Sequence, residues 1–379
     1  MDFSNMFKFE IIHQSNRSRA RVGRIHTPHG VIDTPNYVPV ATNGVLKAMD
    51  NVMTGMHDCQ LMFCNTYHLA LHPGADVVER AGGLHKFIGR QQPIITDSGG
   101  FQVFSLAYGS VASELKSQGT KKTDNAVLKI TEEGVKFRSY RDGALFELTP
   151  EKSVGIQKQL GADIIIPFDE LPPFHCDEHA LRKSFARTHR WQQRSLEAHQ
   201  KDPRQQAMYA VVHGGVDEDL RGKSCQKLSA MGFDGMAIGG SLGKTKADLF
   251  AVLGYCAPYL SAVQPKHLLG IADIPSINVG VTYGIDTFDS CYPTRAARHS
   301  VVLIGDDRIK LQSGKFRDDF SPIDASCPCW TCRHYSRAYI HHLFKAHEPT
   351  ALTLATIHNI QAMMRKMSSL REKILRNEI

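Results

Sequence analysis

No apolar run in this sequence of 379 residues reaches the length of a membrane-spanning helix, so we expect no transmembrane segment. The first residues, Met1-Asp2-Phe3-Ser4-Asn5, lack a basic stretch followed by an apolar one, and a signal peptide is therefore not expected. Internal repeats and low-complexity tracts are absent too. Together these absences predict a globular protein of the cytoplasm with no membrane association.

A disulfide framework is also not expected. The nine cysteines are an odd number, and outside one cluster they occur singly. The isolated ones are Cys59, Cys64, Cys176, Cys225, Cys256 and Cys291. This distribution is typical of a reducing compartment, where single thiols pack in the core.

The composition is that of an ordinary globular protein, with 42% hydrophobic and 22% charged residues. The length suits one large domain with an added subdomain, or two domains. The net charge of +7 suggests an acidic partner. Many basic residues lie in one stretch: Arg295, Arg298, Arg308, Lys310, Lys315, Arg317, Arg333 and Arg337. These charges form either an ordinary solvated surface or, beside the cysteine cluster, a surface for a phosphate backbone.

Three cysteines lie close together in the segment Cys327-Pro-Cys329-Trp-Thr-Cys332, and His358 follows further along the chain. Thiolates and imidazole at close range are the ligands that a tetrahedral Zn²⁺ takes. A zinc ion whose four positions are all filled by the protein is structural. We therefore predict one structural Zn²⁺ held by Cys327, Cys329, Cys332 and His358, with the chemistry elsewhere.

Eight short apolar segments, each followed by glycine or a polar residue, have the composition of strands. They are Tyr37–Ala41, Leu61–Cys64, Pro93–Thr96, Asp163–Phe168, Met208–Val212, Gly235–Ile238, His267–Leu269 and Ile285–Phe288. Stretches with helical apolar spacing fall between most of them: Leu46–His57, Gly74–Ile88, Pro150–Leu160, Glu178–His199, Glu218–Met231 and Lys246–Leu260. Thr149 is the expected N-cap of the helix that begins at Pro150. The alternation predicts an α/β fold of the (β/α)₈ TIM-barrel type. The alternative, an open doubly wound sheet, usually has fewer strands.

Two regions interrupt this alternation. Residues 124–149 have the pattern of antiparallel hairpins, inserted between the third and fourth barrel strands. Residues 300–348 hold the cysteines, and a final helix is expected over Leu352–Leu375. The predicted organisation is a barrel over residues 1–315, a zinc-binding subdomain over 316–360, and a C-terminal helix over 361–379 that packs back on the barrel.

Polar residues gather where the predicted barrel strands end. Barrel enzymes place their reactive groups at the carboxyl ends of the strands, where the following loops converge. The residues in these positions are Asp97, Asp169, His213, Gly240, Gly270 and Asp289. One aspartate after a strand is most often a helix cap, but three around one rim favour an active site.

Carboxylates around one barrel mouth suit glycosyl transfer. One can attack an anomeric carbon while another moves a proton, which gives a double displacement with retention. Asp286 rivals Asp289 as the nucleophile, and the residues alone do not decide between them. Paired glycines let the backbone approach a flat ligand, and Phe101 either stacks on that ligand or packs in the core.

Several motifs together resemble those of the tRNA-guanine transglycosylase family, in order and over nearly the whole chain. They are Asn65-Thr-Tyr-His-Leu69, Thr96-Asp-Ser-Gly-Gly-Phe-Gln102, Phe168-Asp-Glu170, Phe288-Asp289, Pro293-Thr-Arg295, Thr331-Cys-Arg-His-Tyr-Ser-Arg-Ala-Tyr339, and the cysteine cluster with its histidine. The chain has the length of the compact bacterial form. The resemblance implies exchange of guanine at the anticodon wobble position of GUN tRNAs for a 7-deazaguanine base, preQ1 or queuine, in queuosine modification.

The resemblance also implies a role for each matching position. Asp289 is the nucleophile that bonds to the ribose, Asp97 the general acid and base, and Asp169 the carboxylate that reads the purine. The remaining base-binding positions are Ser98, Gly99, Gly100, Phe101, His213 and Gly240. The positions for the anticodon loop are Gly270, Ile271, Ala272, Asp273, Ile274, Pro275, Ser276, Thr294, Arg295, Ala296, Ala297 and Arg298. The cysteine cluster and His358 match the zinc ligands. The implied partners are the tRNA anticodon loop, free guanine, the free 7-deazaguanine base and a second copy of the chain.

The sequence departs from the family pattern around the base. His213 stands where the family usually has Gln, and its imidazole N–H could donate to the purine O6. The loop Gly239-Gly-Ser-Leu-Gly-Lys244 is shorter than the bacterial pattern and has Lys where an acid is expected. Leu171 replaces the usual bacterial Cys, and Gly270-Ile-Ala272 replaces Gly-Val-Gly. A lysine there disfavours preQ1, a compact cation, so we predict queuine as the incoming base. Alternatively, Lys244 points to solvent and the loop change is neutral.

Two other classes of function compete with this one. A non-catalytic tRNA-binding subunit of a transglycosylase complex would not need Asp97 and Asp289, and both are present. A zinc-dependent barrel hydrolase would need metal ligands with an open position at the barrel mouth, and no histidine-rich set occurs there.

Overall fold

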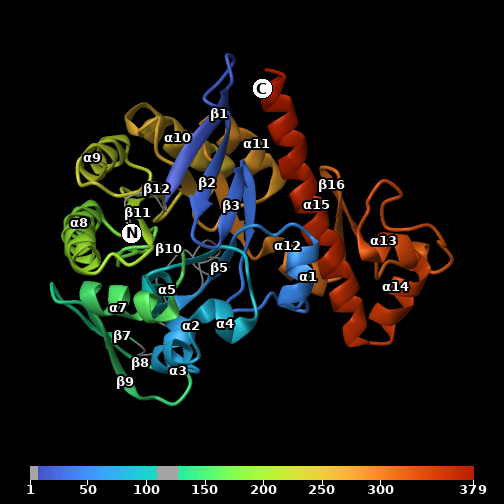
Figure 1. Ribbon diagram of the computed structural model, residues 1–379, viewed down its shortest axis with the longest axis horizontal. Coiled ribbons are helices and arrows are strands. Elements are labelled where there is room, and N and C mark those ends of the chain that lie inside the picture. Colours follow the sequence, from blue (N-terminus) through green and yellow to red (C-terminus); the bar gives the residue numbers. More distant parts are fainter. Residues whose placement is uncertain (1–6, 109–126) are drawn as a thin grey trace.

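The computed structural model of the protein describes residues 7–108 and 127–379 (Figure 1). The first five residues, which carry the prediction about a signal peptide, lie outside these ranges. Residues 124–126 of the predicted hairpin region lie outside them as well. No helix within the described ranges combines the length and the apolar character needed to cross a membrane.

Eight parallel strands form the central sheet, in the order β4-β14-β13-β12-β11-β10-β6-β5 (Figure 1). They are β4 (Asn36–Pro39), β5 (Met62–Cys64), β6 (Ile94–Thr96), β10 (Ile164–Ile165), β11 (Ala207–Val212), β12 (Gly235–Ile238), β13 (Lys266–Leu268) and β14 (Thr287–Ser290). A parallel bridge between Val40 and Phe63 joins the two ends of the sheet. The predicted barrel and all eight of its predicted strands are confirmed.

Successive residues of each strand face opposite sides of the sheet. The inward-facing set packs into one buried cluster that contains Val38, Phe63, Ile95, Tyr209 and Val211. The outward-facing set packs with the surrounding helices in a second, larger cluster. The interior of the barrel is therefore filled with side chains, and only the loops at its carboxyl end are available to form a site.

Four of the long helices around the barrel begin at side-chain caps. In α7 (Pro150–Leu160), Thr149 accepts a hydrogen bond from the Lys152 N–H at 3.2 Å, as predicted. The helices α8 (Glu178–Lys201), α9 (Glu218–Ser229) and α10 (Lys246–Cys256) match their predictions closely. A single helix over Gly74–Ile88 is wrong, because Gly82 and Gly83, each with φ of +90°, separate α3 (Ala75–Arg80) from α4 (Leu84–Ile88).

Other helices are shorter than predicted or were not predicted. The helix expected from Leu46 begins only at α1 (Asn51–Met56), where the side chain of Asp50 accepts from the Met53 N–H. Four short helices that the apolar spacing did not reveal are α2 (Thr66–Leu71), α5 (Gly100–Tyr108), α11 (Ile274–Thr282) and α12 (Tyr292–Arg298). All four directly follow strands, so their first residues border the barrel mouth.

A three-stranded antiparallel sheet near the N-terminus was not predicted. It consists of β1 (Lys8–Gln14), β2 (Arg21–Thr27) and β3 (Gly30–Thr34), drawn in blue in Figure 1. Ile25 and Ile32 join the cluster inside the barrel, and no helix residue belongs to that cluster. This sheet therefore closes the amino end of the barrel, away from the loops that follow the strands.

The inserted region is an antiparallel sheet, as predicted. Its strands are β7 (Val127–Ile130), β8 (Val135–Arg138) and β9 (Leu145–Leu148). Helix α8 fixes the turn between β7 and β8, because the Trp191 indole N–H donates to the Glu132 carbonyl at 2.8 Å. The insertion is therefore anchored to the barrel wall.

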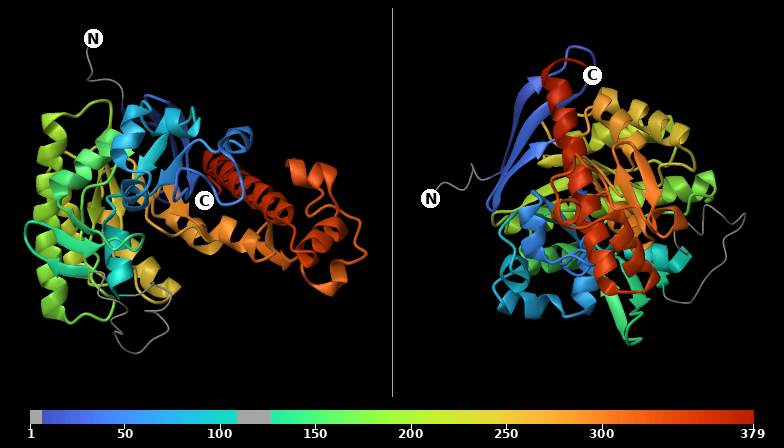
Figure 2. Two further views of the ribbon diagram at one scale, coloured as in Figure 1. Left: turned by 90° about the horizontal axis from the view of Figure 1, so that it is seen from below. Right: turned by 90° about the vertical axis from the view of Figure 1, so that its right-hand side faces the viewer.

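The C-terminal part lies to one side of the barrel (Figure 2). It contains the hairpin β15 (Val301–Ile304) and β16 (Asp307–Lys310), then α13 (Trp330–His334), α14 (Arg337–Lys345) and α15 (Pro349–Leu375). Helix α15 carries His358 and then continues to the N-terminal sheet, where the Arg371 guanidinium donates to the Pro35 carbonyl at 2.8 Å. A boundary between residues 360 and 361 therefore falls inside one continuous helix.

A buried carboxylate holds the amino end of the barrel together. Asp163 accepts hydrogen bonds from the His29 ring at 2.7 Å and the Ile94 N–H at 2.8 Å, and the His85 ring lies 3.2 Å away. Burial pushes the pKa of Asp163 upward, but hydrogen bonds from the two histidines outweigh it and hold this pKa well below its usual range. The hydrogen bond to Asp163 raises the pKa of His29.

Replacing Asp163 by Ala is expected to lower the free energy of unfolding by about 1–3 kcal/mol near pH 5.5, because it leaves the buried Ile94 N–H without its acceptor and removes the partner of the exposed His29 ring. The Asp163 contribution is lost as pH falls from about 4 toward its lowered pKa. The His29 contribution is complete below about pH 6.5 and is lost as pH rises through its raised pKa. Denaturant unfolding at pH 5.5 and pH 8.5 measures the effect. The loss should be larger at pH 5.5, and Asp76→Ala at an exposed pair should change neither value. Equal losses at both pH values would contradict the assignment.

Candidate active site

Asp97 follows β6 and is buried, with 8% of its surface exposed. One carboxylate oxygen accepts the Thr66 N–H at 2.7 Å, and the other accepts the Asn65 side-chain amide at 2.8 Å. Burial raises the pKa of Asp97 to about 6, against the hydrogen bonds from Asn65 and Thr66, and the charge of Asp169 adds to the rise. A carboxyl group with this pKa can both donate and accept a proton near neutral pH.

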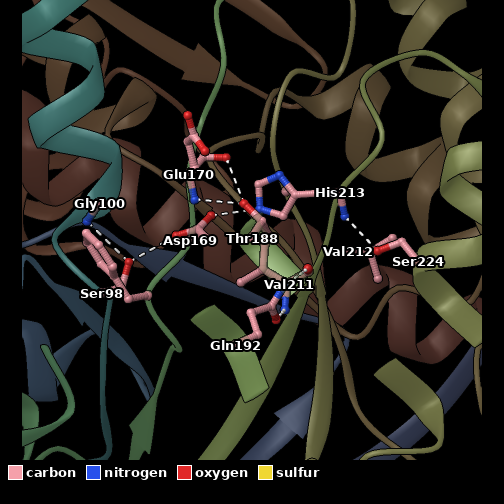
Figure 3. A network of polar contacts seen from close by, with 12 residues as sticks. Ser98, Gly100, Asp169, Glu170, Thr188, Gln192, Val211, Val212, His213 and Ser224 are labelled. Carbon is pink, nitrogen blue, oxygen red and sulfur yellow. Dashed lines mark hydrogen bonds and ion pairs between the residues drawn. The ribbon is translucent and has the colours of Figure 1, made fainter. Parts of the chain in front are cut away.

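Asp169 follows β10 and lies between two polar side chains (Figure 3). The Ser98 hydroxyl donates to one carboxylate oxygen at 3.0 Å, and the His213 Nε2 lies 2.8 Å from the other. Ser98 also accepts from the Gly100 N–H at 3.2 Å, which ties the start of α5 to this group. Each carboxylate oxygen retains a second lone pair, so Asp169 can still accept two hydrogen bonds from a ligand.

His213 follows β11, and its ring is oriented by Asp169 and by a neighbouring glycine. Gly240 has φ of +73°, and a Cβ at this position would lie 2.9 Å from the His213 Nδ1. Because Nε2 already bonds Asp169, only Nδ1 remains for a ligand, and it donates only when the imidazole is protonated. The residue pattern alone did not indicate that His213 interacts with Asp169.

Asp289 lies in β14, facing the barrel interior, and 5% of its surface is exposed. Its Oδ1 accepts the Gly270 N–H at 2.8 Å and lies 3.0 Å from the His267 Nε2. Gly270 has φ of +74°, a conformation that favours glycine and that directs its N–H to the carboxylate. Within residues 7–108 and 127–379, no hydrogen-bond donor contacts the Oδ2 of Asp289, so this oxygen can react.

Asp286 has a different environment from Asp289. It is fully buried at the amino end of β14, where Arg21 of the N-terminal sheet contacts both of its oxygens, at 2.9 and 2.6 Å. The Lys266 backbone N–H also donates to it at 2.7 Å. Asp286 therefore stabilises the closed end of the barrel, and Asp289 is the one of the two aspartates that lies toward the mouth.

A cavity of about 180 Å³ opens beside His213. Its walls come from the loop after β10, the start of α8, and the loops after β11 and β12. Apolar walls include Pro172, Phe174, Leu181, Phe185 and Val216, while Ser184 and Ser241 provide hydroxyl groups. The Lys244 ammonium lies 5.0 Å from the centre of the Phe174 ring, but Lys244 is exposed and does not itself line the cavity.

The positions suggested for ligand and RNA differ widely in exposure. Phe101 is 47% exposed at the start of α5, which excludes core packing and leaves its ring available to a ligand. Pro275 and Arg295 are exposed on the rim. Six of the positions suggested for RNA have buried side chains: Ala272, Ile274, Ser276, Thr294, Ala296 and Ala297. The buried ones can shape an RNA surface only through the backbone. Asp273 caps α11 and bonds Lys246 at 2.7 Å.

The cysteine cluster and His358 are brought together as predicted. The ligand atoms of Cys327, Cys329, Cys332 and His358 all lie within 4.8 Å of one another, which is close enough to hold a metal ion. The His358 Nδ1 faces the thiols, 3.2 Å from the Cys332 Sγ, while Nε2 lies 2.7 Å from the Leu303 carbonyl. This outer hydrogen bond leaves Nδ1 as the metal-binding nitrogen.

Two parts of the site were missed by the sequence reading. His267 was assigned only to a strand, although its ring contacts Asp289. Asn65 and Thr66 were noted only as part of a motif, although they hold the Asp97 carboxylate. Strand alternation could have found His267, because it places His267, like Asp289, on the inner face of the barrel.

Comparison with known proteins identifies the family. Residues 15–379 match the model of the family described as "Queuine tRNA-ribosyltransferase". A curated protein of that name from Protochlamydia amoebophila (strain UWE25) is 60% identical over 98% of this chain and 96% of its own length. Relatives with the same name from Chlamydia felis and Chlamydia trachomatis serovar L2 are 54% and 53% identical over 98% of this chain and 99% of their own. Since the match spans nearly all of both chains, the protein belongs to the queuine tRNA-ribosyltransferase family.

Proposed function

We propose that this protein is a tRNA-guanine transglycosylase that replaces guanine at the anticodon wobble position with a 7-deazaguanine base. The observation that carries the proposal is the set of three carboxylates at one barrel mouth, each held differently. Among the described residues no donor contacts one oxygen of Asp289, Asp97 has a pKa raised to about 6, and Asp169 is held by Ser98 and His213 with a lone pair left on each oxygen. These are the states that a nucleophile, an acid–base group and a base-reading group require.

In the first step, the Oδ2 of Asp289 attacks C1′ of the wobble nucleotide. A C1′–O bond forms and the bond to the base nitrogen breaks, with the electron pair leaving on guanine. Asp97 in its protonated form supplies a proton to the departing base. In the second step, the ionised Asp97 removes a proton from the incoming base, which attacks C1′ and releases Asp289. Two displacements at one carbon retain the original configuration.

Asp169 supports the choice of base. A purine with an N1–H and an adjacent 2-amino group presents two parallel donors, and the carboxylate accepts both. Adenine lacks this arrangement and would leave the buried acceptor unpaired. Gly240 provides a backbone surface beside the base, and the exposed Phe101 is placed to stack on its face.

The cavity beside His213 favours queuine as the incoming base. With the N1–H and amino group on Asp169, the edge of the base that carries the 7-substituent faces His213 and Ser241. Apolar walls with two serine hydroxyls suit the cyclopentene diol of queuine. The Lys244 ammonium beside Phe174 adds a positive charge near the cavity, which disfavours the compact cation of preQ1.

A base-exchange assay on labelled tRNA tests both the activity and the base. Queuine should be incorporated with a kcat/KM at least about tenfold above that of preQ1, because a filled pocket contributes about 1–3 kcal/mol. Leu181→Trp, which fills the cavity, should reduce queuine incorporation and spare guanine exchange, while Leu181→Met should change neither. Incorporation of preQ1 equal to or above that of queuine would refute the base assignment. Absence of guanine exchange would refute the activity.

The C-terminal part suits a structural zinc ion and contact with tRNA. Three thiols and one imidazole nitrogen complete a tetrahedral set with no position left for substrate. Exposed basic residues are frequent in this part of the chain and in α12 just before it: Arg295, Arg308, Lys310, Lys315, Arg317 and Arg333. They provide a surface for the phosphates of the anticodon stem. We further propose a homodimer that acts in the cytoplasm, since one tRNA is larger than one barrel mouth.

A non-catalytic tRNA-binding subunit is disfavoured. Such a protein would not need a carboxylate fixed on one oxygen only, as in Asp289, or a second carboxyl group with a raised pKa, as in Asp97. A zinc hydrolase is disfavoured because the metal-binding cluster with a complete ligand set comes from α13, the segment before it and α15, beside the barrel and not at its mouth (Figure 1).

A further inference from the structure

We propose that His267 is a positioning residue for the nucleophile, which fixes the orientation of the Asp289 carboxylate. This inference rests on the proposed function, because it assigns the attack to Asp289. Nothing in the motifs or in the family match identifies this histidine. It is found from the contacts inside the barrel.

The imidazole of His267 is fully buried in β13 and bonded at both nitrogens. Nε2 lies 3.0 Å from the Oδ1 of Asp289, and Nδ1 lies 2.8 Å from the Thr287 hydroxyl. The Phe63 ring lies nearly parallel to the imidazole, with 6.0 Å between ring centres. The ring is therefore held in place next to the carboxylate by Thr287 on the neighbouring strand and by the ring of Phe63.

The Asp289 carboxylate determines which nitrogen carries the proton. A hydroxyl group can donate to Nδ1, whereas an ionised carboxylate can only accept, so the neutral ring bears its hydrogen on Nε2. The chain Thr287–His267–Asp289 then runs in one direction, with each group donating to the next. Because all three residues face the barrel interior from two adjacent strands, the parallel pairing of β13 with β14 aligns them.

The hydrogen bonds to Asp289 are asymmetric, and this is the feature that matters for catalysis. The His267 ring and the Gly270 N–H both engage Oδ1, which fixes the plane of the carboxylate and leaves Oδ2 for C1′. Donors to the ionised carboxylate stabilise it relative to the protonated carboxyl, which cannot attack. His267 itself touches neither base nor ribose in this arrangement, so its effect passes through Asp289.

Two other buried histidines have different surroundings from His267. His199, in α8, lies 3.1 Å from the Lys158 ammonium, and His341 contacts the Leu311 carbonyl. Neither contacts a carboxylate at the barrel mouth. His199 therefore provides a matched control, a buried imidazole of the same chain that lies away from the site.

The test compares His267→Phe, which removes the donor, with His267→Gln, which retains a neutral N–H donor. Single-turnover formation of the covalent RNA adduct is measured against pH, together with KM for tRNA. His267→Phe should slow adduct formation on the order of 10²-fold with KM for tRNA unchanged, since a small misplacement of a reacting group has an effect of this size. The acid limb of its pH profile should move to higher pH. His267→Gln should recover most of the rate, and His199→Phe should match the parent protein.

Three results would overturn the proposal. The first is a His267→Phe protein with the parent rate. The second is equal loss in the Phe and Gln variants with an unchanged pH profile, which would mean that the ring only fills space. If His267→Phe does not fold, Thr287→Val keeps the imidazole but removes the partner of its Nδ1. Its rate should fall severalfold, and a parent rate and pH profile in that variant would be the third contrary result. Parent activity in Asp289→Ala would instead refute the proposed function itself.

Discussion

Asp289→Ala is expected to abolish the covalent complex between protein and tRNA and to reduce base exchange on the order of 10⁴-fold or more. The carboxylate is the only group at the carboxyl end of β14 placed to form an ester with ribose, and alanine leaves no oxygen in its place. Denaturing gel electrophoresis of protein incubated with labelled tRNA measures the adduct. Loss of the shifted band, with tRNA binding retained, is the expected result.

Two matched variants control this experiment. Asp289→Asn keeps the shape of the side chain and should also form no adduct, which separates nucleophilicity from packing. Asp286→Asn should mainly reduce stability, because it weakens a buried ion pair with Arg21 at the closed end of the barrel. An adduct that persists in Asp289→Ala, or that disappears only in Asp286→Asn, would show that the nucleophile is misassigned.

Cys332→Ala is expected to lose the bound metal ion and to unfold the C-terminal part while leaving the barrel folded. Metal-ligand bonds supply about 10–16 kcal/mol of folding free energy in small zinc domains, so loss of a ligand is severe. Metal analysis should give about one zinc per chain in the parent protein and close to none in the variant. Weaker tRNA binding should account for its reduced activity.

The control for the metal experiment is Cys291→Ser, at an exposed thiol outside the cluster, which should keep the full zinc content. Binding and chemistry are separated by raising the tRNA concentration. If zinc is structural, excess tRNA should restore part of the exchange rate in Cys332→Ala. If the exchange rate at saturating tRNA disappears together with zinc while the barrel stays folded, a catalytic metal would be indicated.

The barrel was predictable because its strands have an unusually plain pattern. Each is a short apolar run that ends at glycine or a polar residue, and the burial of both faces requires such runs. The capped start of α7 at Thr149 and Pro150 was predictable for a local reason, since the cap needs only adjacent residues. Three of the four predicted zinc ligands were predictable for the same reason, because the three cysteines lie close together in the sequence.

What the sequence did not reveal depends on contacts between distant segments. Strands β1 to β3 carry many polar residues and were not recognised. Their few apolar residues pack against the interior of the barrel, and the sequence pattern does not show that contact. The choice between Asp286 and Asp289 required Arg21, which lies 265 residues away from Asp286 in the chain. His267 looked like any strand residue until its neighbour on the next strand was known.

The pairing of β4 with β14 has a consequence for how the chain is made. Asn36–Pro39 emerge early during synthesis, but their partners Thr287–Ser290 leave the ribosome only when most of the protein has been translated. Until then the first barrel strand exposes an unpaired edge, which can associate with other nascent chains. The contact between Arg371 and the Pro35 carbonyl forms later still, because Arg371 lies well beyond β14 in the chain.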